Sequence, residues 1–252
     1  AATGVRRQRC ALAAAGSAGT PSGLGRASLY QLCPPAAPDW AASIAFRYRK
    51  RGGSGRIEPV RHVAPIRKAI GIPTTFNFLG PLANPAQPVA TSLGVSSAAM
   101  APLMAQELAQ RGRTALVFRG SDGLDELTTT GPSQIWAVWG GQVFEFELNP
   151  VDLGLKTVKL ADLVGGDAHY NAQVARQLFA GDQSGQLAAI REIVALNAAA
   201  GLVAYQLAKR GSDLFGESGL KHEFQDALAH AFSAIDSGDA GSKLSAWMAA
   251  TQ

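Results

Sequence analysis

The pattern of apolar and polar positions divides the chain near residue 60. From residue 61 onward, short apolar runs alternate with polar breaks that carry glycine or proline, whereas residues 1–60 show neither a helical stripe nor strand alternation. Strands that alternate with helices along a chain are typical of an α/β layer arrangement. We therefore predict an α/β domain over residues 61–252, with a central, mostly parallel sheet flanked by helices.

Three segments predict the strands of this sheet. Residues 90–96 and residues 114–120, TALVFRG, are short apolar runs, and the second is typical of a buried parallel strand. Residues 134–148, QIWAVWGGQVFEFEL, alternate on both sides of Gly140-Gly141. This pattern predicts a hairpin with a two-residue turn.

The remaining periodic segments predict helices. In residues 97–112, Met100, Leu103, Met104 and Leu108 fall on one face, which we expect to pack in the core. Other helices are expected over residues 61–71, 167–181, 186–211 and, as a pair, about 220–248. Between them, residues 74–88 are punctuated by Gly and Pro, which favours a loop whose aromatic side chains pack nearby.

Charge is distributed unevenly along the chain. Residues 1–68 hold 12 Lys and Arg against 2 Asp and Glu, whereas residues 69–252 hold 11 against 17. Residues 47–56, RYRKRGGSGR, are basic and broken by glycine. Residues 1–60 are thus either a disordered basic arm or a surface that contacts phosphate or nucleic acid.

Composition also bears on the compartment. Every Ala-, Leu- or Val-rich run is interrupted before the ~18 apolar residues that a membrane-spanning helix needs, so we expect a soluble protein without a membrane partner. The two cysteines, Cys10 and Cys33, are too few for a disulfide framework and have no metal-ligand spacing, which favours the cytoplasm.

The stretch GSDGLDELTTTGP, residues 120–132, carries the densest candidate chemistry. Asp122, Asp125 and Glu126 place three carboxylates within five residues at the expected carboxyl end of a strand, where ligands of α/β sheets gather. Like charges so close repel one another unless a cation or backbone amides compensate them. Two interpretations stay open: a Mg²⁺ site, or an Asx turn at Asp122 followed by a helix that begins at Asp125-Glu126.

Other candidate positions have simpler explanations. Asp167, after Gly165-Gly166, is typical of a helix N-cap. Arg67 can form a surface salt bridge or can clasp a carboxylate with its guanidinium. The four histidines show no ligand spacing, so we treat them as surface or capping residues, and the chain contains neither a Walker loop nor a dinucleotide fingerprint.

Four segments, in this order and spacing, resemble the carboxyl-terminal part of anthranilate phosphoribosyltransferase: RHVAPIRKAIGIPTTFNFLGPLANPA, DGLDELTTTGP, LVGGDAHYNA and VALNAAAGLVAY. The resemblance covers residues 61–252 and implies a phosphoribosyltransferase and nucleoside-phosphorylase type of α/β domain. Members of this family are homodimers that join anthranilate to phosphoribosyl pyrophosphate and release pyrophosphate, a step of tryptophan biosynthesis.

The resemblance also implies roles for three residues. Asp125 and Glu126 are expected to ligate a Mg²⁺ that binds the pyrophosphate of the donor, and Arg67 is expected to grip the anthranilate carboxylate. Because the ribose carbon gains positive character as pyrophosphate leaves, neutralisation of the leaving group lowers the barrier. The aromatic amine is a ready nucleophile, so its orientation matters more than a strong base, and no catalytic acid or base is assigned.

This chain departs from the family pattern upstream of residue 61. The family's helical domain, its GTGGD-type glycine loop and its KHGN segment are not found, Ile57 and Glu58 replace a His-Pro step, and Arg119 stands where histidine is frequent. We expect residues 1–60 to be a disordered arm or a product of a shifted reading frame. Without the donor loop, the chain is expected to show little or no turnover alone.

Two other functions compete with the transferase. A non-catalytic relative of the same fold that binds nucleic acid would suit the basic residues 1–60, but it has no need of DGLDE, so nucleic acid ranks below the two small molecules as a partner. A nucleoside phosphorylase shares the architecture, but nothing in the sequence calls for phosphate in place of pyrophosphate.

Overall fold

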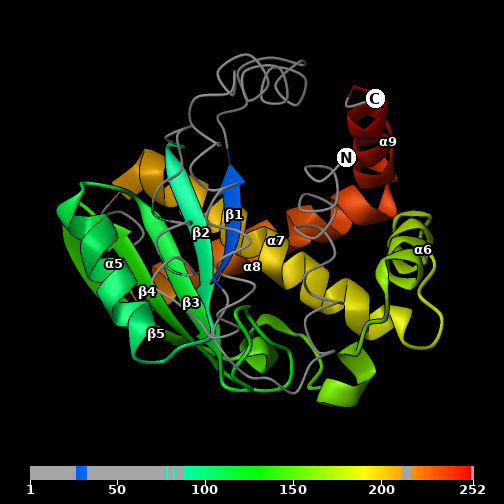
Figure 1. The fold of residues 1–252 in the computed structure, drawn as a ribbon, viewed down its shortest axis with the longest axis horizontal. Coiled ribbons are helices and arrows are strands. Elements are labelled where there is room, and N and C mark those ends of the chain that lie inside the picture. Colours follow the sequence, from blue (N-terminus) through cyan, green and yellow to red (C-terminus); the bar gives the residue numbers. More distant parts are fainter. Residues whose placement is uncertain (1–26, 33–77, 79–81, 83–87, 212–216, 251–252) are drawn as a thin grey trace, which may run out of the picture.

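The computed structural model describes residues 27–32, 78, 82, 88–211 and 217–250. In that part of the chain a five-stranded sheet with the order β1-β2-β3-β4-β5 has helices on both faces, which confirms the α/β prediction (Figure 1). The strands are β1 (Ala27–Leu32), β2 (Ala90–Val95), β3 (Ala115–Gly120), β4 (Ser133–Trp139) and β5 (Gln142–Leu148).

The sheet is mixed, so the prediction of a mostly parallel sheet is wrong for the described strands. Only β2 and β3 run parallel, with Leu93 opposite Val117, whereas the three other neighbouring pairs are antiparallel. The reason lies in the connections: β2 and β3 are joined through a crossover helix, α5 (Met100–Gln110), whereas the connections that follow β3 and β4 contain no helix among the described residues. The chain returns from β3 to β4 through a loop and from β4 to β5 through a tight turn.

Strand β1 is a second difference from the sequence-based expectation. It lies within residues 1–60, for which no strand was expected, and it pairs antiparallel with β2 over its whole length. An edge strand needs only backbone hydrogen bonds to one neighbour, so it requires no alternation of apolar side chains. The rest of residues 1–60, including Cys10 and the basic run 47–56, lies outside the described residues.

The predicted hairpin is confirmed. Gly140 and Gly141 form its two-residue turn with φ angles of 60° and 77°, and Trp139 pairs with Gln142 on either side. Two successive positive φ angles belong to the type I′ turn, whose twist matches that of the flanking strands. Residues with a Cβ adopt this geometry reluctantly, which explains the Gly-Gly sequence.

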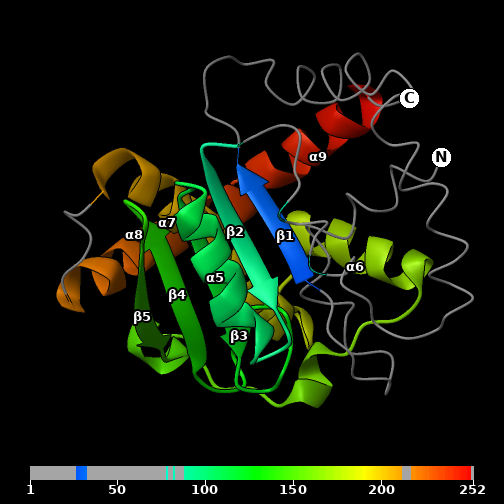
Figure 2. The same cartoon turned by 60° about the vertical axis from the view of Figure 1, so that its left-hand side comes forward.

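The helices that follow the hairpin are those that the pattern predicts, and Figure 2 shows how they are arranged beside the sheet. They are α6 (Ala168–Phe179), α7 (Leu187–Arg210), α8 (Glu217–Asp236) and α9 (Asp239–Ala250), preceded by the short 3₁₀ helices η2 (Pro150–Leu153) and η3 (Leu160–Leu163). Helix α7 contacts β1, β2, β3 and β4, and α8 packs on α7.

Alternate side chains of the strands feed two cores. Leu93, Val117 and Trp136 pack toward α5, whereas Phe118 and Ile135 pack toward α7. This alternation follows from the two-residue period of a strand.

The apolar face of α5 differs slightly from the predicted one. Met104 and Leu108 are buried and Met100 is partly buried, as expected, but Leu103 is 54% exposed. The buried face also includes small residues, among them Ala101 and Ala105, so its centre lies away from Leu103. Phe78, from the proline-punctuated segment, packs against this core, as expected.

Ion pairs at both ends hold α7 and α8 in an antiparallel arrangement. Near the start of α7, Arg191 binds Asp236 with two nitrogens and lies 4.1 Å from the ring centroid of Phe232. Near its end, Arg210 binds Glu223 at 2.6 Å. Because Arg191 both binds a carboxylate with two nitrogens and covers an aromatic ring, it fixes the orientation of the two helices as well as stabilising their contact.

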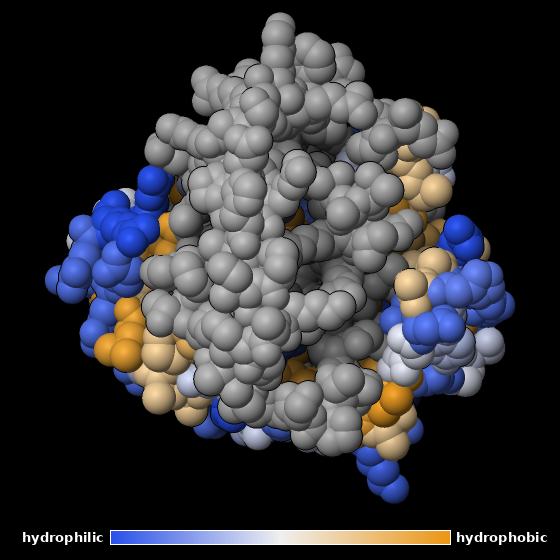
Figure 3. Space-filling view, in the orientation of Figure 1, coloured by the Kyte–Doolittle hydropathy of each residue, from blue (hydrophilic) through white to orange (hydrophobic). Residues whose placement is uncertain are grey.

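Helix α7 is the one described helix that is long and apolar enough to cross a membrane. Of its most apolar stretch, 61% is buried inside the fold, as in the core helix of a soluble protein. On the face of the molecule seen in Figure 3, the described surface at the left and right margins is largely hydrophilic, and smaller hydrophobic patches lie within both margins.

The packing of α8 on α7 yields a test of the fold. Phe224 of α8 is fully buried in the core that α7 shares with the sheet, so Phe224→Ala should lower the free energy of unfolding by about 3–5 kcal/mol. Urea denaturation monitored by tryptophan fluorescence measures the loss. The neighbouring exposed Gln225→Ala serves as the control and should change stability by less than about 0.5 kcal/mol; equal effects of the two variants would contradict this packing.

Candidate functional site

The acid loop, residues 120–132, connects β3 to β4 and closes on itself. Gly120 pairs with Ser133 at the adjoining ends of the two strands, and the Ser121 N–H donates to the Pro132 carbonyl at 3.0 Å. Arg119 Nε donates to the Ser96 carbonyl at 2.7 Å, which ties the ends of the parallel strands β2 and β3 together. The loop therefore lies at the carboxyl edge of the parallel pair, where ligands of α/β sheets gather.

The first carboxylate of the loop has a structural task. Asp122 Oδ1 accepts the Leu124 N–H at 3.0 Å, and Oδ2 accepts the hydroxyls of Thr128 at 2.5 Å and Thr130 at 3.0 Å. The predicted Asx turn at Asp122 is thus confirmed. Because both of its oxygens already accept hydrogen bonds, Asp122 stabilises the loop, and the threonines that follow the acidic residues supply its donors.

The carboxylate of Glu126 differs from that of Asp122 in its burial and in its hydrogen bonding. Glu126 is 1% exposed, and neither carboxylate oxygen has a hydrogen-bond partner among the described residues. Burial raises the pKa of Glu126 well above its usual value, and the nearby charges of Asp125 and then Asp122 raise it further. A buried polar group without partners is costly, so this carboxylate calls for a compensating cation or a proton.

Asp125 precedes this buried group and is partly exposed. No helix begins at Asp125-Glu126, since the loop continues in bends to Pro132, so that part of the alternative interpretation is wrong. Among the described residues, no three side chains of His, Cys, Asp or Glu converge as a ready-made metal cluster. Two oxygen-bearing side chains are nevertheless the usual protein share of a Mg²⁺ site, which completes its shell with water and substrate phosphates.

Two positions that the sequence analysis assigned no role hold the loop in place. Asn197 of α7 is buried and binds the backbone of Leu127. Gly94 of β2 lies so close to the Asp125 carbonyl oxygen that a Cβ at this position would overlap it. An asparagine within an otherwise apolar helical face, as in ALNAAAG, is the signal that could have drawn attention to Asn197.

Asp167 caps α6, as predicted. Its side chain accepts the Tyr170 N–H at 2.8 Å, and the Asn171 amide exchanges two hydrogen bonds of 2.9 Å with the backbone of Gly166. These bonds satisfy groups at the start of the helix that would otherwise lack partners, so the two side chains serve the architecture.

The remaining predicted positions do not join the acid loop in the described structure. Arg67 and His62 lie outside the described residues, so the role of Arg67 stays a prediction. His169, His222 and His230 are exposed, and His222 pairs with Asp226 one helical turn away at 3.6 Å. The expectation that these three are surface residues is confirmed.

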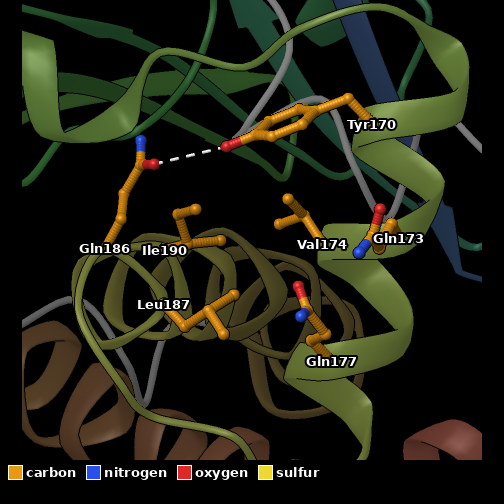
Figure 4. Close-up of a pocket in the computed structure, with 7 residues that line it drawn as sticks. All are labelled: Tyr170, Gln173, Val174, Gln177, Gln186, Leu187 and Ile190. Atoms are coloured by element: carbon orange, nitrogen blue, oxygen red, sulfur yellow. Dashed lines mark hydrogen bonds between the residues drawn. The ribbon is translucent and has the colours of Figure 1, made fainter.

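A pocket of about 160 Å³ lies elsewhere, between α6 and the start of α7 (Figure 4). Tyr170, whose hydroxyl lies 3.5 Å from Gln186 Oε1, borders it together with further glutamine and aliphatic side chains. The described residues that line it include no carboxylate and no residue of the acid loop. Its lining residue nearest to Asn197 along α7, Ile190, is seven residues away, about 10 Å along the helix. The titratable groups therefore favour the acid loop as the functional site.

The raised pKa of Glu126 predicts a pH-dependent stability of the metal-free chain. A carboxyl group whose pKa is raised by folding contributes stability below its unfolded pKa, and this contribution is lost as the pH rises through the folded pKa. In the presence of a chelator, Glu126→Gln should therefore have the same free energy of unfolding as the wild type at low pH and a larger one at high pH, because only the wild type must then bury a charged group.

Urea unfolding at a series of pH values measures this difference. The exposed Glu147→Gln is the matched control and should show no such trend. A stability difference between Glu126→Gln and the wild type that does not change with pH would contradict the raised pKa.

Comparison with known proteins shows the family to which this chain is similar. Residues 53–241 match the model of the glycosyl transferase family, a/b domain. The chain is 48% identical over 191 residues to an anthranilate phosphoribosyltransferase of Leifsonia xyli, an alignment that covers 76% of this chain and 53% of the relative. The chain thus spans about half the length of the curated relatives that it matches.

Solved structures give the same result. The anthranilate phosphoribosyltransferase of Thermus thermophilus is 36% identical with a TM-score of 0.61, over 76% of this chain and 52% of that one. The enzyme of Saccharomyces cerevisiae in complex with PRPP and Mg is 28% identical with a TM-score of 0.63, over 75% of this chain and 50% of that one. The resemblance inferred from the four sequence segments is confirmed, and the chain belongs to the glycosyl transferase family, whose a/b domain it contains.

Proposed function

We propose that this chain is the α/β part of an anthranilate phosphoribosyltransferase, which transfers the phosphoribosyl group of phosphoribosyl pyrophosphate to anthranilate and releases pyrophosphate. The observation that carries the proposal is the Glu126 carboxylate, buried without a hydrogen-bond partner among the described residues and preceded by Asp125. The similarity to a yeast enzyme solved with PRPP and Mg supports the same assignment.

The residues of the acid loop fit a magnesium ion. Asp125 and Glu126 offer carboxylate oxygens, the donors that this hard cation prefers, and Asp122 is occupied by its own hydrogen bonds. A bound ion would neutralise charge on the departing pyrophosphate. We therefore assign Asp125 and Glu126 as its protein ligands.

The chain's own groups prepare this site in two ways. Because burial and two neighbouring carboxylates raise the pKa of Glu126, its carboxyl group gives up a proton when a cation takes the proton's place. The hydrogen bonds of Asp122 and the threonines fix the loop before any ligand arrives, so little ordering is left for the moment of binding.

The acceptor side of the reaction is assigned to Arg67. A guanidinium can bind the carboxylate of anthranilate with two parallel hydrogen bonds and so orient the aromatic amine toward the ribose carbon. We assign no general acid or base, since the amine is itself a nucleophile. We further propose that the complete protein acts in the cytoplasm as a homodimer.

The proposal predicts that pyrophosphate binding depends on the acid pair. Isothermal titration of the full chain with pyrophosphate should show binding about tenfold or more tighter with Mg²⁺ than with a chelator. Asp125→Asn and Glu126→Gln should each remove most of this gain, because a neutral amide is a poor Mg²⁺ ligand.

Asp226→Asn, an exposed carboxylate on α8, is the control and should keep the full effect of Mg²⁺. The assignment would be contradicted if the affinity for pyrophosphate did not depend on Mg²⁺, or if the gain from Mg²⁺ fell equally in all three variants. A chain that instead bound single-stranded nucleic acid with a steep dependence on salt would favour the non-catalytic alternative.

A further inference from the structure

Asn197 is the one polar side chain among the buried residues of α7. It is 2% exposed, and its amide makes three hydrogen bonds. Oδ1 accepts the Leu127 N–H at 3.0 Å, while Nδ2 donates to the Leu127 carbonyl at 2.8 Å and to the Ile193 carbonyl at 3.0 Å. Asparagine has a low helix propensity, so its presence in the middle of a long buried helix points to these tertiary bonds.

The bond to the Leu127 N–H acts directly on Glu126. That N–H belongs to the planar peptide group whose carbonyl is the Glu126 carbonyl, so fixing the N–H fixes the orientation of the whole group. The second bond, to the Leu127 carbonyl, fixes the next peptide group. Two successive peptide planes, one of them attached to the Glu126 Cα, are therefore held by one side chain of α7.

Gly94 fixes the peptide group before Glu126. The Asp125 carbonyl oxygen lies against the Cα of Gly94, in the space that any Cβ there would occupy. Strand β2 and helix α7 thus hold the backbone on the two sides of Glu126, and the loop has little freedom to move its carboxylates.

We propose that Asn197 is a positioning residue for the Asp125-Glu126 carboxylate pair, because its amide fixes the two peptide groups that directly follow Glu126, while Gly94 confines the one between Asp125 and Glu126. Helix α7 is a suitable anchor, since its apolar residues are packed between the sheet and α8. Only an amide has both the acceptor and the two donor hydrogens that the three backbone partners require: aspartate lacks the donors and leucine lacks both. The part of this inference that concerns a metal rests on the proposed function.

Hydrogen exchange of the full chain, in the absence of metal, tests the positioning role. Asn197→Leu keeps the volume of the side chain and removes its hydrogen bonds, and Asn197→Ala removes both. The reporters are the amides of Leu124 and Thr128, which donate to Asp122 Oδ1 and Ser133 Oγ. The Thr128 amide shares its peptide group with the Leu127 carbonyl that Asn197 binds, whereas Leu124 lies three residues before Leu127 and reports on the loop beyond the bonded groups. In both variants, their exchange should accelerate about tenfold or more relative to the amides of β3 and β4.

Leu207→Ala controls for a general loss of stability. Leu207 is a buried residue of the same helix, ten positions and about 15 Å beyond Asn197. This variant should leave the ratio of loop to strand exchange unchanged. If the ratio also stays unchanged in Asn197→Leu, the positioning role is refuted.

The wild type provides a measurement that does not depend on any variant's folding. The Leu127 amide should be protected to about the level of the β3 amides, because Leu127 and its acceptor residue Asn197 are both buried. An unprotected Leu127 amide would overturn the proposal.

Metal binding separates this inference from the proposed function. With pyrophosphate present, Mn²⁺ used as a paramagnetic probe of the site should bind about tenfold more weakly to Asn197→Leu than to Leu207→Ala, as measured by water proton relaxation. Equal binding by these two variants would overturn the role of Asn197 in presenting the carboxylates. A wild-type chain that binds no Mn²⁺ would refute the proposed function, while the exchange ratio still decides whether Asn197 positions the loop.

Discussion

The packing of α7 across one face of the sheet is the interaction on which the rest of the described structure depends. Its buried residues contact four strands, and α8 covers its other side. Burial of so many apolar side chains supplies most of the favourable free energy for this layer. The same packing brings Asn197 within hydrogen-bond distance of Leu127 in the acid loop, 70 residues earlier in the chain. The backbone of the candidate site is therefore attached directly to the packed core.

The acid loop divides its carboxylates between two tasks. Asp122 accepts hydrogen bonds from a backbone amide and two threonine hydroxyls, and it stabilises the loop in a manner that needs no cation. Glu126 is buried beside like charges and lacks such donors among the described residues, so its ionised form is destabilised. A destabilised charged group within a loop that other hydrogen bonds stabilise is typical of sites that are completed by a ligand.

Local patterns predicted the local structure well. The Gly140-Gly141 turn, the Asp167 N-cap and the extents of α6 and α7 all follow from neighbouring residues, because turn geometry, capping and helical periodicity are short-range properties. The direction of the strands was less predictable. It depends on which connection carries a crossover helix, and only that between β2 and β3 does so in the described part of the chain.

The sequence could point to the candidate site, but not to the residues that support it. Three carboxylates in five residues marked the loop, and the four family segments singled out Asp125 and Glu126 within it. An asparagine within an apolar helical face marks Asn197 as unusual, but the partners of Asn197 and Gly94 lie in a segment far away in sequence, so a local pattern cannot identify these contacts. Arg67 lies outside the described residues, and its assignment still rests on the resemblance alone.

The central claim is that Glu126 and Asp125 together hold a divalent cation against pyrophosphate. Anomalous scattering from crystals of the chain grown with Mn²⁺ and pyrophosphate tests it most directly. We expect one Mn²⁺ peak within about 2.0–2.4 Å of a carboxylate oxygen of each residue, the range for such cations and oxygen ligands, with Asp122 still bound to its threonines. A Mn²⁺ ion found elsewhere, with the Glu126 carboxyl group still enclosed and unligated, would contradict the account.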